Sequence, residues 1–256
     1  MPPAGDVDYS RHGTGYSHRR QADPTIAARI HRALGPARTV VNVGAGAGSY
    51  EPTDRRVVAV EPSEAMIAQR PTGGAVVRAV AGALPLADRS VDAAMATVTI
   101  HQWPDPVAGL AEMRRVARGP VVVLTFDPDA LDRLWLMEYA ADLHRVERSR
   151  YPTIDTVVSA LGGSASVLEV PVPFDCTDGF TEAFFGRPEA FLDPSVRRSQ
   201  SAWSFVDPAA ESASVERLRS GLASGRWDAD HGALRTQSHF VGALRLVVGH
   251  PSSATD

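Results

Sequence analysis

The stretch Val41-Asn42-Val43-Gly44-Ala45-Gly46-Ala47-Gly48-Ser49 decides the fold of this chain. It continues a β-branched run that begins at Thr39, and a short apolar run closed by glycines is typical of a buried parallel strand. Glycine at the carboxyl end of such a strand lets the backbone approach a ligand where a side chain would collide. The stretch therefore predicts a first strand and a loop that contacts a cofactor.

The spacing of the glycines separates two kinds of cofactor. A dinucleotide-binding loop has glycine at its first, third and sixth positions, whereas here the fifth position is Gly48 and the sixth is Ser49. A second apolar run, 57–60, ends at Glu61. A carboxylate at that place can accept hydrogen bonds from both hydroxyls of a ribose. The glycine spacing therefore disfavours NAD, and Glu61 favours a different cofactor that contains ribose.

Apolar runs alternate with helical periodicity along the first half of the chain. Strands are expected over 39–43, 57–60, 76–80, 91–98 and 121–124, and helices over 25–34, 63–70 and 106–117. This alternation is typical of a doubly wound α/β sheet. Glu61 follows Gly48 by only 13 positions, and Pro52 interrupts them, so the usual first crossover helix does not fit there. The N-terminal helix is the nearest element to cover that face.

The second half has a less regular pattern. Helices are expected over 130–148 and 153–161, strands over 167–172 and 242–248, and short helices broken by proline over 180–225. Phenylalanines such as Phe184 and Phe185 suit either a lid over a pocket or a small core of the lid itself. We therefore divide the chain into an N-terminal arm and helix (1–35), a core (36–174 and 240–251) and a cap or lid insertion (175–239).

Composition excludes several classes of function. The chain of 256 residues has a net charge of −4 and no basic cluster, so nucleic acid is not an expected partner. All 26 basic residues are arginine, which removes Schiff-base chemistry, P-loop chemistry and a Tyr/Lys dehydrogenase pair. The single Cys176 supplies neither a disulfide framework nor a thiolate zinc cluster, and no metal is expected. Short apolar runs and the lack of a signal-like start predict a cytoplasmic protein without a membrane partner.

Further motifs accompany the glycine loop. They are Val-Ala-Val-Glu-Pro-Ser at 58–63, Ala-Leu-Pro-Leu-Ala-Asp at 83–88, Ser-Val-Asp at 90–92 and His-Gln-Trp-Pro-Asp at 101–105. Together these stretches resemble the class I S-adenosylmethionine-dependent methyltransferases, most closely the small-molecule branch, over about 39–126. The resemblance implies a Rossmann-like, doubly wound seven-stranded sheet with a C-terminal helical cap insertion, its last hairpin formed by 167–172 and 242–248. It also implies S-adenosyl-L-methionine as cofactor and a small-molecule acceptor, which the Phe-rich cap predicts to be apolar.

The resemblance also implies roles for individual residues. Those expected to bind the methionine part of the cofactor are Arg20, Gly44, Ala45, Gly46, Gly48 and Thr97. Tyr16 belongs to a lead-in segment that would fold over the cofactor, and Asn42 is also expected to bind the cofactor. Arg20 would pair with the cofactor's carboxylate, and Thr97 would face its ammonium. Those expected around the nucleoside are Glu61, Pro62, Ala81 and Gly82. His101 is the side chain nearest the transferred methyl group, and it is either a general base or a residue that packs on the cofactor.

Two positions depart from the family pattern. Asn42 stands where an acid usually lies, and Val80 stands where many members bind adenine with an acid. With the short first crossover, these departures keep open a cofactor-binding protein without methyl-transfer activity. A nicotinamide oxidoreductase is a third hypothesis, which Ser49 and the missing lysine disfavour. No Asp/Asn-Pro-Pro-aromatic motif follows the fourth strand, which disfavours methylation of nucleic-acid amino groups; the acceptor atom and the oligomeric state stay open.

Overall fold

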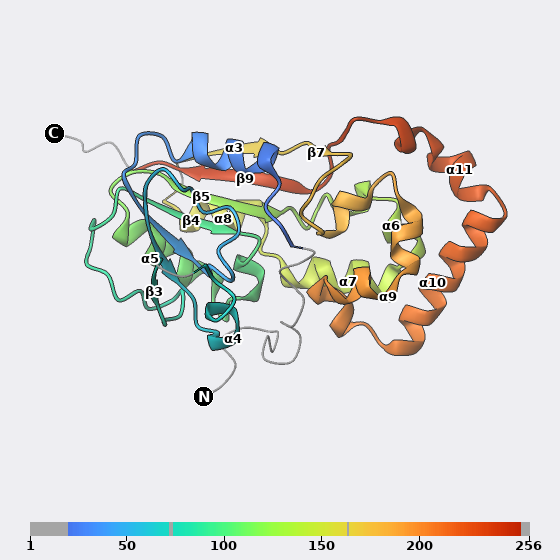
Figure 1. Cartoon of the computed structure of the whole chain (residues 1–256), viewed down its shortest axis with the longest axis horizontal. Helices are drawn as coiled ribbons and strands as arrows, with labels where there is room; N and C mark the ends of the chain where they lie inside the picture. The colour runs from blue at the N-terminus through green and yellow to red at the C-terminus, as the bar shows by residue number, and fades with distance from the viewer. Residues whose placement is uncertain (1–19, 72–73, 163, 252–256) are drawn as a thin grey trace.

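A seven-stranded sheet is the central element of the computed structural model, which describes residues 20–71, 74–162 and 164–251 (Figure 1). The strand order is β3-β2-β1-β4-β5-β9-β6, and β9 is antiparallel to β5 and β6, whereas the other neighbours are parallel. The strands are β1 (Thr39–Val43), β2 (Arg56–Val60), β3 (Ala75–Val77), β4 (Ala93–Thr97), β5 (Val121–Phe126), β6 (Ala165–Glu169) and β9 (Leu244–Gly249). This is the predicted Rossmann-like sheet, and β6 and β9 form the expected final pair.

Different helices cover the two faces of the sheet. Successive side chains of a strand point to opposite faces. Val122 and Leu124 of β5 therefore join a cluster with α3, while Val121 and Val123 join a cluster with α5 and α8. The helices of this half are α3 (Pro24–Ala33), α4 (Glu64–Ile67), α5 (Pro106–Val116) and α8 (Ile154–Ala160).

Helix α3 takes the place of the first crossover helix. Residues 44–55 between β1 and β2 contain no helix, as the short spacing predicts. Asp23 caps α3 by accepting hydrogen bonds from the backbone N–H groups of the next turn (2.9 and 3.1 Å). Ile26, Ile30 and Leu34 are fully buried against the sheet, and burial of each such side chain contributes about 1.5–3 kcal/mol. The prediction that the N-terminal helix covers this face is confirmed.

Helices gather at one end of the sheet and form a second lobe, which we call the cap (residues 131–150 and 181–236; Figure 1). Its helices are α6 (Leu136–Tyr139), α7 (Ala141–Arg150), α9 (Pro194–Arg198), α10 (Pro208–Ala223) and α11 (Arg226–His231). The indole N–H of Trp135 donates to the carbonyl of Phe185 (2.7 Å), and the rings of Trp135 and Trp227 meet edge to face at 5.3 Å. Side chains of α6 and α7 belong to the same hydrophobic core as the later helices, so the cap includes residues before the range 175–239. The domain boundaries proposed from the sequence stay a prediction.

Two predicted elements are divided in the structure. The helix expected over 130–148 is a 3-10 turn (Leu131–Arg133) followed by α6 and α7, which Ala140 separates with a non-helical backbone (φ −131°, ψ 65°). The strand expected over 167–172 ends at Glu169, because Pro171 has no N–H for the ladder. The chain then forms β7 (Val172–Pro173), which pairs with β8 (His239–Phe240) outside the main sheet. Every helix of the described residues is too short or too polar to span a bilayer.

Candidate active site

A cavity of about 670 Å³ lies at the carboxyl ends of β1, β2 and β4. Its lining includes the glycine loop at 44–47, Glu61 after β2 and residues 97–99 after β4, so we call it the loop cavity. The strand order reverses between β1 and β4. Ligands of open α/β sheets bind at such a reversal, outside the carboxyl ends of the strands.

The glycine loop needs its glycines for two physical reasons. Gly44 has a φ of +67°, and a Cβ atom there would collide with the side chain of Thr99. Gly46 has a φ of +51°, and its N–H donates to Glu61 Oε2 (2.8 Å). Left-handed backbone of this kind is readily accessible only to glycine. The loop is therefore shaped for a close approach of ligand to backbone.

Glu61 presents a buried carboxylate to the loop cavity. Its second oxygen accepts from the N–H of Ser63 (2.9 Å), so both oxygens are positioned by backbone donors. Burial raises the pKa of Glu61 above its ordinary value, and the two backbone hydrogen bonds and Arg70 oppose that rise. A carboxylate has about four acceptor sites, so the hydrogen bonds from Gly46 and Ser63 leave capacity for ligand hydroxyls.

Asn42 lies behind the glycine loop and does not line the loop cavity. Its amide donates to Glu51 Oε1 (2.9 Å), and Glu51 forms an ion pair with Arg70 (2.7 Å). The guanidinium of Arg70 also donates to the carbonyl of Gly46 (3.2 Å). Position 42 lacks the acid that is usual in the family, but Glu51 places a carboxylate next to it. An acid at both positions would bring two carboxylates together, and like charges at short distance repel each other.

Arg20 and Asp178 bring opposite charges to the loop cavity from segments far apart in sequence. Arg20 Nε lies 2.5 Å from Asp178 Oδ1, and the hydroxyl of Tyr50 donates to Asp178 Oδ2 (2.9 Å). Asp178 is buried, and burial together with Asp178 raises the pKa of Tyr50. The segment before α3 is therefore tied to the segment that leads into the cap, across the mouth of the loop cavity.

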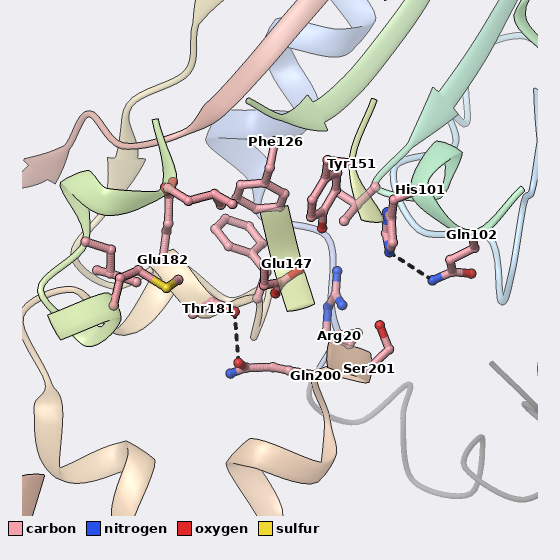
Figure 2. A pocket seen from close by; sticks show the side chains of 15 residues that line it. Arg20, His101, Gln102, Phe126, Glu147, Tyr151, Thr181, Glu182, Gln200 and Ser201 are labelled. Carbon is pink, nitrogen blue, oxygen red and sulfur yellow. Dashed lines mark hydrogen bonds between the residues drawn. The ribbon is translucent and has the colours of Figure 1, made fainter. Parts of the chain in front are cut away.

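A second cavity of about 550 Å³, which we call the cap cavity, lies between the sheet and the cap (Figure 2). It adjoins the loop cavity, because Arg20, Val98 and Gln102 line both. Val98 has a φ of +49°, and a left-handed conformation costs a non-glycine residue about 1–3 kcal/mol. The strained residue therefore stands at the junction of the two cavities.

The cap cavity combines an apolar wall with buried polar side chains. Its apolar lining includes Phe126, Leu131, Leu134, Met137 and Phe180. Its buried polar lining includes His101, Glu182 and Gln200, which are only 7%, 2% and 5% exposed. Each of the three has an atom without a hydrogen-bond partner among the described residues: His101 Nδ1, Glu182 Oε2 and Gln200 Nε2. Such atoms are costly to bury alone, so the cavity is suited to a ligand that has polar groups.

His101 is held between an aromatic ring and a neighbouring amide. Its ring centroid lies 4.5 Å from that of Tyr151, and its Nε2 lies 3.4 Å from Gln102 Nε2. Burial lowers the pKa of His101 well below its ordinary value, and the positive charges of Arg150 and Arg20 lower it further. The imidazole is therefore neutral at pH 7, and a neutral imidazole can accept a proton.

The structure brings some of the predicted site residues together and leaves others apart. Those that line the loop cavity are Arg20, Gly44, Ala45, Gly46, Glu61 and Thr97, and His101 lines the cap cavity. Those outside both linings are Asn42, Gly48, Pro62, Ala81 and Gly82, and Tyr16 lies outside the described residues. Residues that the sequence did not indicate are Tyr50, Val98, Asp178, Glu182 and Gln200. Tyr50 and Val98 directly follow Ser49 and Thr97, so their neighbours in sequence could have indicated them. No local motif marks Asp178, Glu182 and Gln200, because folding brings them to the site from a distant segment.

The loop cavity fits the cofactor that the sequence resemblance implies. Glu61 offers acceptors for ribose hydroxyls, and the glycine loop offers backbone without side chains. Arg20 and Asp178 offer one positive and one negative group, which suits the carboxylate and ammonium of an amino acid. Among the described residues, no group of three His, Cys, Asp or Glu side chains could hold a metal ion.

Comparison with known proteins gives the same result. A family model described as a methyltransferase domain matches residues 41–123. A solved structure from Anabaena variabilis, provisionally described as a methyltransferase from an antibiotic biosynthesis pathway, is 26% identical with a TM-score of 0.84. The match covers 92% of this chain and 100% of that chain. No curated protein sequence matches the chain.

Two more distant structures share the fold. The geranyl diphosphate C-methyltransferase of Streptomyces coelicolor, in complex with Mg²⁺, geranyl diphosphate and S-adenosyl-L-homocysteine, is 14% identical with a TM-score of 0.50. That match covers 88% of this chain and 76% of that chain. The cyclase SpnF is 12% identical with a TM-score of 0.53, over 96% of this chain and 94% of that chain.

The family match coincides with the strands and loops that build the loop cavity. The likeness to the Anabaena structure extends over the cap as well, since it covers nearly the whole chain. The chain is therefore a class I S-adenosylmethionine-dependent methyltransferase, and S-adenosyl-L-methionine is its cofactor.

Proposed function

We propose that this methyltransferase acts on a small molecule bound in the cap cavity while the cofactor occupies the loop cavity. The observation that carries the proposal is that the two cavities adjoin and share Arg20, Val98 and Gln102. Methyl transfer is a direct displacement, which needs donor and acceptor held in line and water removed. Positioning of this kind can supply about 7–11 kcal/mol of the barrier.

The residues of the loop cavity bind and orient the cofactor. Glu61 accepts hydrogen bonds from the ribose, and Arg20 and Asp178 contact the amino-acid part. The loop at 44–48 and Thr97 surround that part through backbone groups. Predicted contacts at Tyr16, Asn42, Pro62, Ala81 and Gly82 belong to the same proposal. When bound, the sulfonium cofactor supplies an electrophilic methyl group.

His101 accepts the proton that the acceptor loses. Its neutral imidazole has Nδ1 buried at the cap cavity without a partner among the described residues. The bound cofactor would supply the methyl group and keep the electron pair of its carbon–sulfur bond on sulfur, while the acceptor atom would contribute the lone pair of the new bond. The proton of the acceptor O–H or N–H passes to Nδ1 of His101 in the tautomer that is protonated at Nε2. This tautomer requires the Gln102 amide to turn its oxygen toward Nε2, in place of the nitrogen that lies 3.4 Å away.

Replacing His101 with glutamine separates this role from simple packing. We expect kcat to fall about 100-fold or more, which is typical for loss of a general base. The Kd for S-adenosylhomocysteine should stay within about twofold, because His101 does not line the loop cavity. In the wild-type chain, the acid limb of the rate profile should lie below 6.5, since the pKa of His101 is lowered. An unchanged kcat would show that His101 packs in the site and does not act as the base.

The acceptor itself can be found by following S-adenosylhomocysteine release across a set of small molecules. The apolar wall of the cap cavity supports an acceptor with an apolar body, and the buried polar atoms support polar groups on it. Release that depends on both cofactor and acceptor is the expected result. Cofactor binding without release for any acceptor would instead favour a cofactor-binding protein of the same fold.

A further inference from the structure

We infer that the acceptor carries a cationic amine that docks on Glu182, at the end of the cap cavity away from the cofactor. A different atom of the acceptor is then the one that receives the methyl group. This inference rests on the proposed function, because it assigns the anchoring group of the acceptor in the cavity proposed for it.

Glu182 is fixed in place with one oxygen turned to structure and the other left for a ligand. It belongs to a 3-10 helix (Thr181–Phe184) and is 2% exposed. Its Oε1 accepts from the N–H of Ala243 (2.5 Å), and the N–H of Leu244 also acts on the carboxyl group. A Cβ at Gly242 would collide with this carboxyl group. Its Oε2 is buried and has no partner in the part of the chain that the structure describes. A donor on the acceptor would satisfy this oxygen.

The charges around Glu182 leave it available for a cation. The two nearest arginines already have carboxylate partners: Arg133 pairs with Glu169 (2.9 Å), and Arg245 lies 3.4 Å from Asp127 and 3.6 Å from Glu169. No ion pair between described residues includes Glu182. A positively charged group on the acceptor would form an ion pair with Glu182 and offset the cost of burying its carboxylate alone.

Other charged groups that line the cap cavity are paired elsewhere. Arg20 pairs with Asp178 (2.5 Å), and Glu147 lies 4.0 Å from Arg150. The opposite charges within each of these two pairs cancel. The negative charge that is left among the described lining residues is therefore that of Glu182.

Aromatic rings add a second feature that favours a cation. Phe126 meets Tyr151 and Phe180 edge to face, at centroid distances of 5.6 and 5.5 Å, and all three line the cap cavity. The face of an aromatic ring attracts a cation, by about 0.5–2 kcal/mol. Rings together with a buried carboxylate therefore select an ammonium group over a neutral hydroxyl or an anion.

The position of Glu182 separates the amine from the methylated atom. Figure 2 shows Glu182 on the side of the cavity opposite His101 and Gln102. Gln102 also lines the loop cavity, so the His101 side is the one next to the cofactor. An amine on Glu182 thus anchors the acceptor at its far end.

The test compares aromatic amines with isosteres that differ only in charge. The probes are 2-phenylethylamine, tyramine and tryptamine, each matched with its alcohol and its carboxylate, titrated calorimetrically at pH 8 into chain saturated with S-adenosylhomocysteine. We expect at least one amine to bind about tenfold or more tightly than its alcohol. In the Glu182→Gln variant that amine should lose about tenfold, while the alcohol stays within about twofold.

Three results would overturn the inference. They are alcohols that bind as tightly as their amines in every pair, an amine preference that survives in Glu182→Gln, and a wild-type chain that binds no amine of the set. Methylation of tyramine on its nitrogen instead of its oxygen would overturn the orientation.

A matched variant controls for the change of charge. Glu216→Gln on α10 removes an exposed carboxylate that pairs with Arg219, far from the cavity lining, and should leave amine affinity unchanged. Unchanged affinity for S-adenosylhomocysteine and a Tm no lower than that of the wild-type chain show that Glu182→Gln is folded. If alcohols are methylated as readily as amines, the amine anchor on Glu182 is wrong and the proposed function stands. If amine binding depends on Glu182 but no probe is methylated, the proposed function is contradicted and the anchor stands.

Discussion

The loop cavity and the cap cavity adjoin, yet they are built in different ways. The loop cavity is made largely of backbone and of residues close in sequence, from Gly44 to Glu61, and its carboxylate is satisfied by backbone donors. The cap cavity is made of side chains from distant segments, and three of its buried polar atoms have no partner among the described residues. The carboxylate of the loop cavity has hydrogen-bond partners even without a ligand, whereas these polar atoms of the cap cavity have none among the described residues. With the proposed function, this difference would place acceptor specificity in the cap cavity and cofactor binding in the loop cavity.

The largest expected effect concerns the core of the cap. Phe185 is fully buried and stacks on Phe240 at 5.2 Å, so Phe185→Ala should lower the free energy of unfolding by about 3–5 kcal/mol. Phe205→Ala, at a position that is 44% exposed, is the matched control and should have a small effect in urea titrations. A change in acceptor Michaelis constant at full stability would instead make Phe185 part of the acceptor site.

A second prediction tests the loop cavity. Replacing Glu61 with alanine would remove the two charge-assisted hydrogen bonds that we propose it makes to the ribose, each worth about 1.5–3 kcal/mol. We expect S-adenosylhomocysteine to bind about 100-fold more weakly in calorimetry, because part of the loss is offset by water. Glu64→Ala on α4, an exposed carboxylate, should leave the affinity unchanged. Equal affinity in the Glu61 variant would show that another residue binds the ribose.

The third prediction uses pH to test the buried carboxylate of Glu182 in the cap cavity. Burial raises the pKa of Glu182 to about 7, against backbone hydrogen bonds and nearby arginines that lower it. The folded chain therefore binds a proton there that the unfolded chain releases near pH 4.5, so its contribution to stability is complete below 4.5 and is lost as pH rises through 7. Relative to Glu182→Gln, the wild-type chain should lose about 3 kcal/mol over this range.

Urea unfolding at a series of pH values measures this difference. Bound 2-phenylethylamine should reduce the loss, since a cation favours the ionised carboxylate. Parallel pH profiles for the wild-type chain and the variant would show that Glu182 does not titrate in this range.

The smallest expected effect lies behind the glycine loop. Asn42→Asp places a buried carboxylate against the half-buried Glu51 in place of a 2.9 Å hydrogen bond, and should cost about 1–3 kcal/mol of stability. Adding Glu51→Gln to that variant restores one donor and one acceptor, and should recover most of the loss. If the double variant is no more stable than the single one, Asn42 and Glu51 are not coupled.

Several parts of the fold could be predicted because their signals are local. The apolar run from Thr39 ends at glycines whose left-handed backbone only glycine adopts readily, and β1 and the loop follow it closely. The 13-residue spacing to Glu61 excluded a crossover helix by chain length alone. The periodicity of 25–34 indicated a helix, and its apolar face had to be buried somewhere, which the uncovered sheet face provides.

Other parts depended on contacts that no local pattern records. The helix expected over 130–148 is interrupted at Leu134 and at Ala140. Between these two positions Trp135 donates to Phe185, fifty positions away, which is a tertiary contact that helix propensity does not record. Asp178 reaches Arg20 across 158 positions, and Glu182 reaches Ala243 across 61. Strand spacing and glycine position predicted the glycine loop and Glu61 from sequence alone, because backbone geometry there depends on neighbouring residues. Only the tertiary structure decided the acceptor half, because its chemistry arises from side chains that folding brings together.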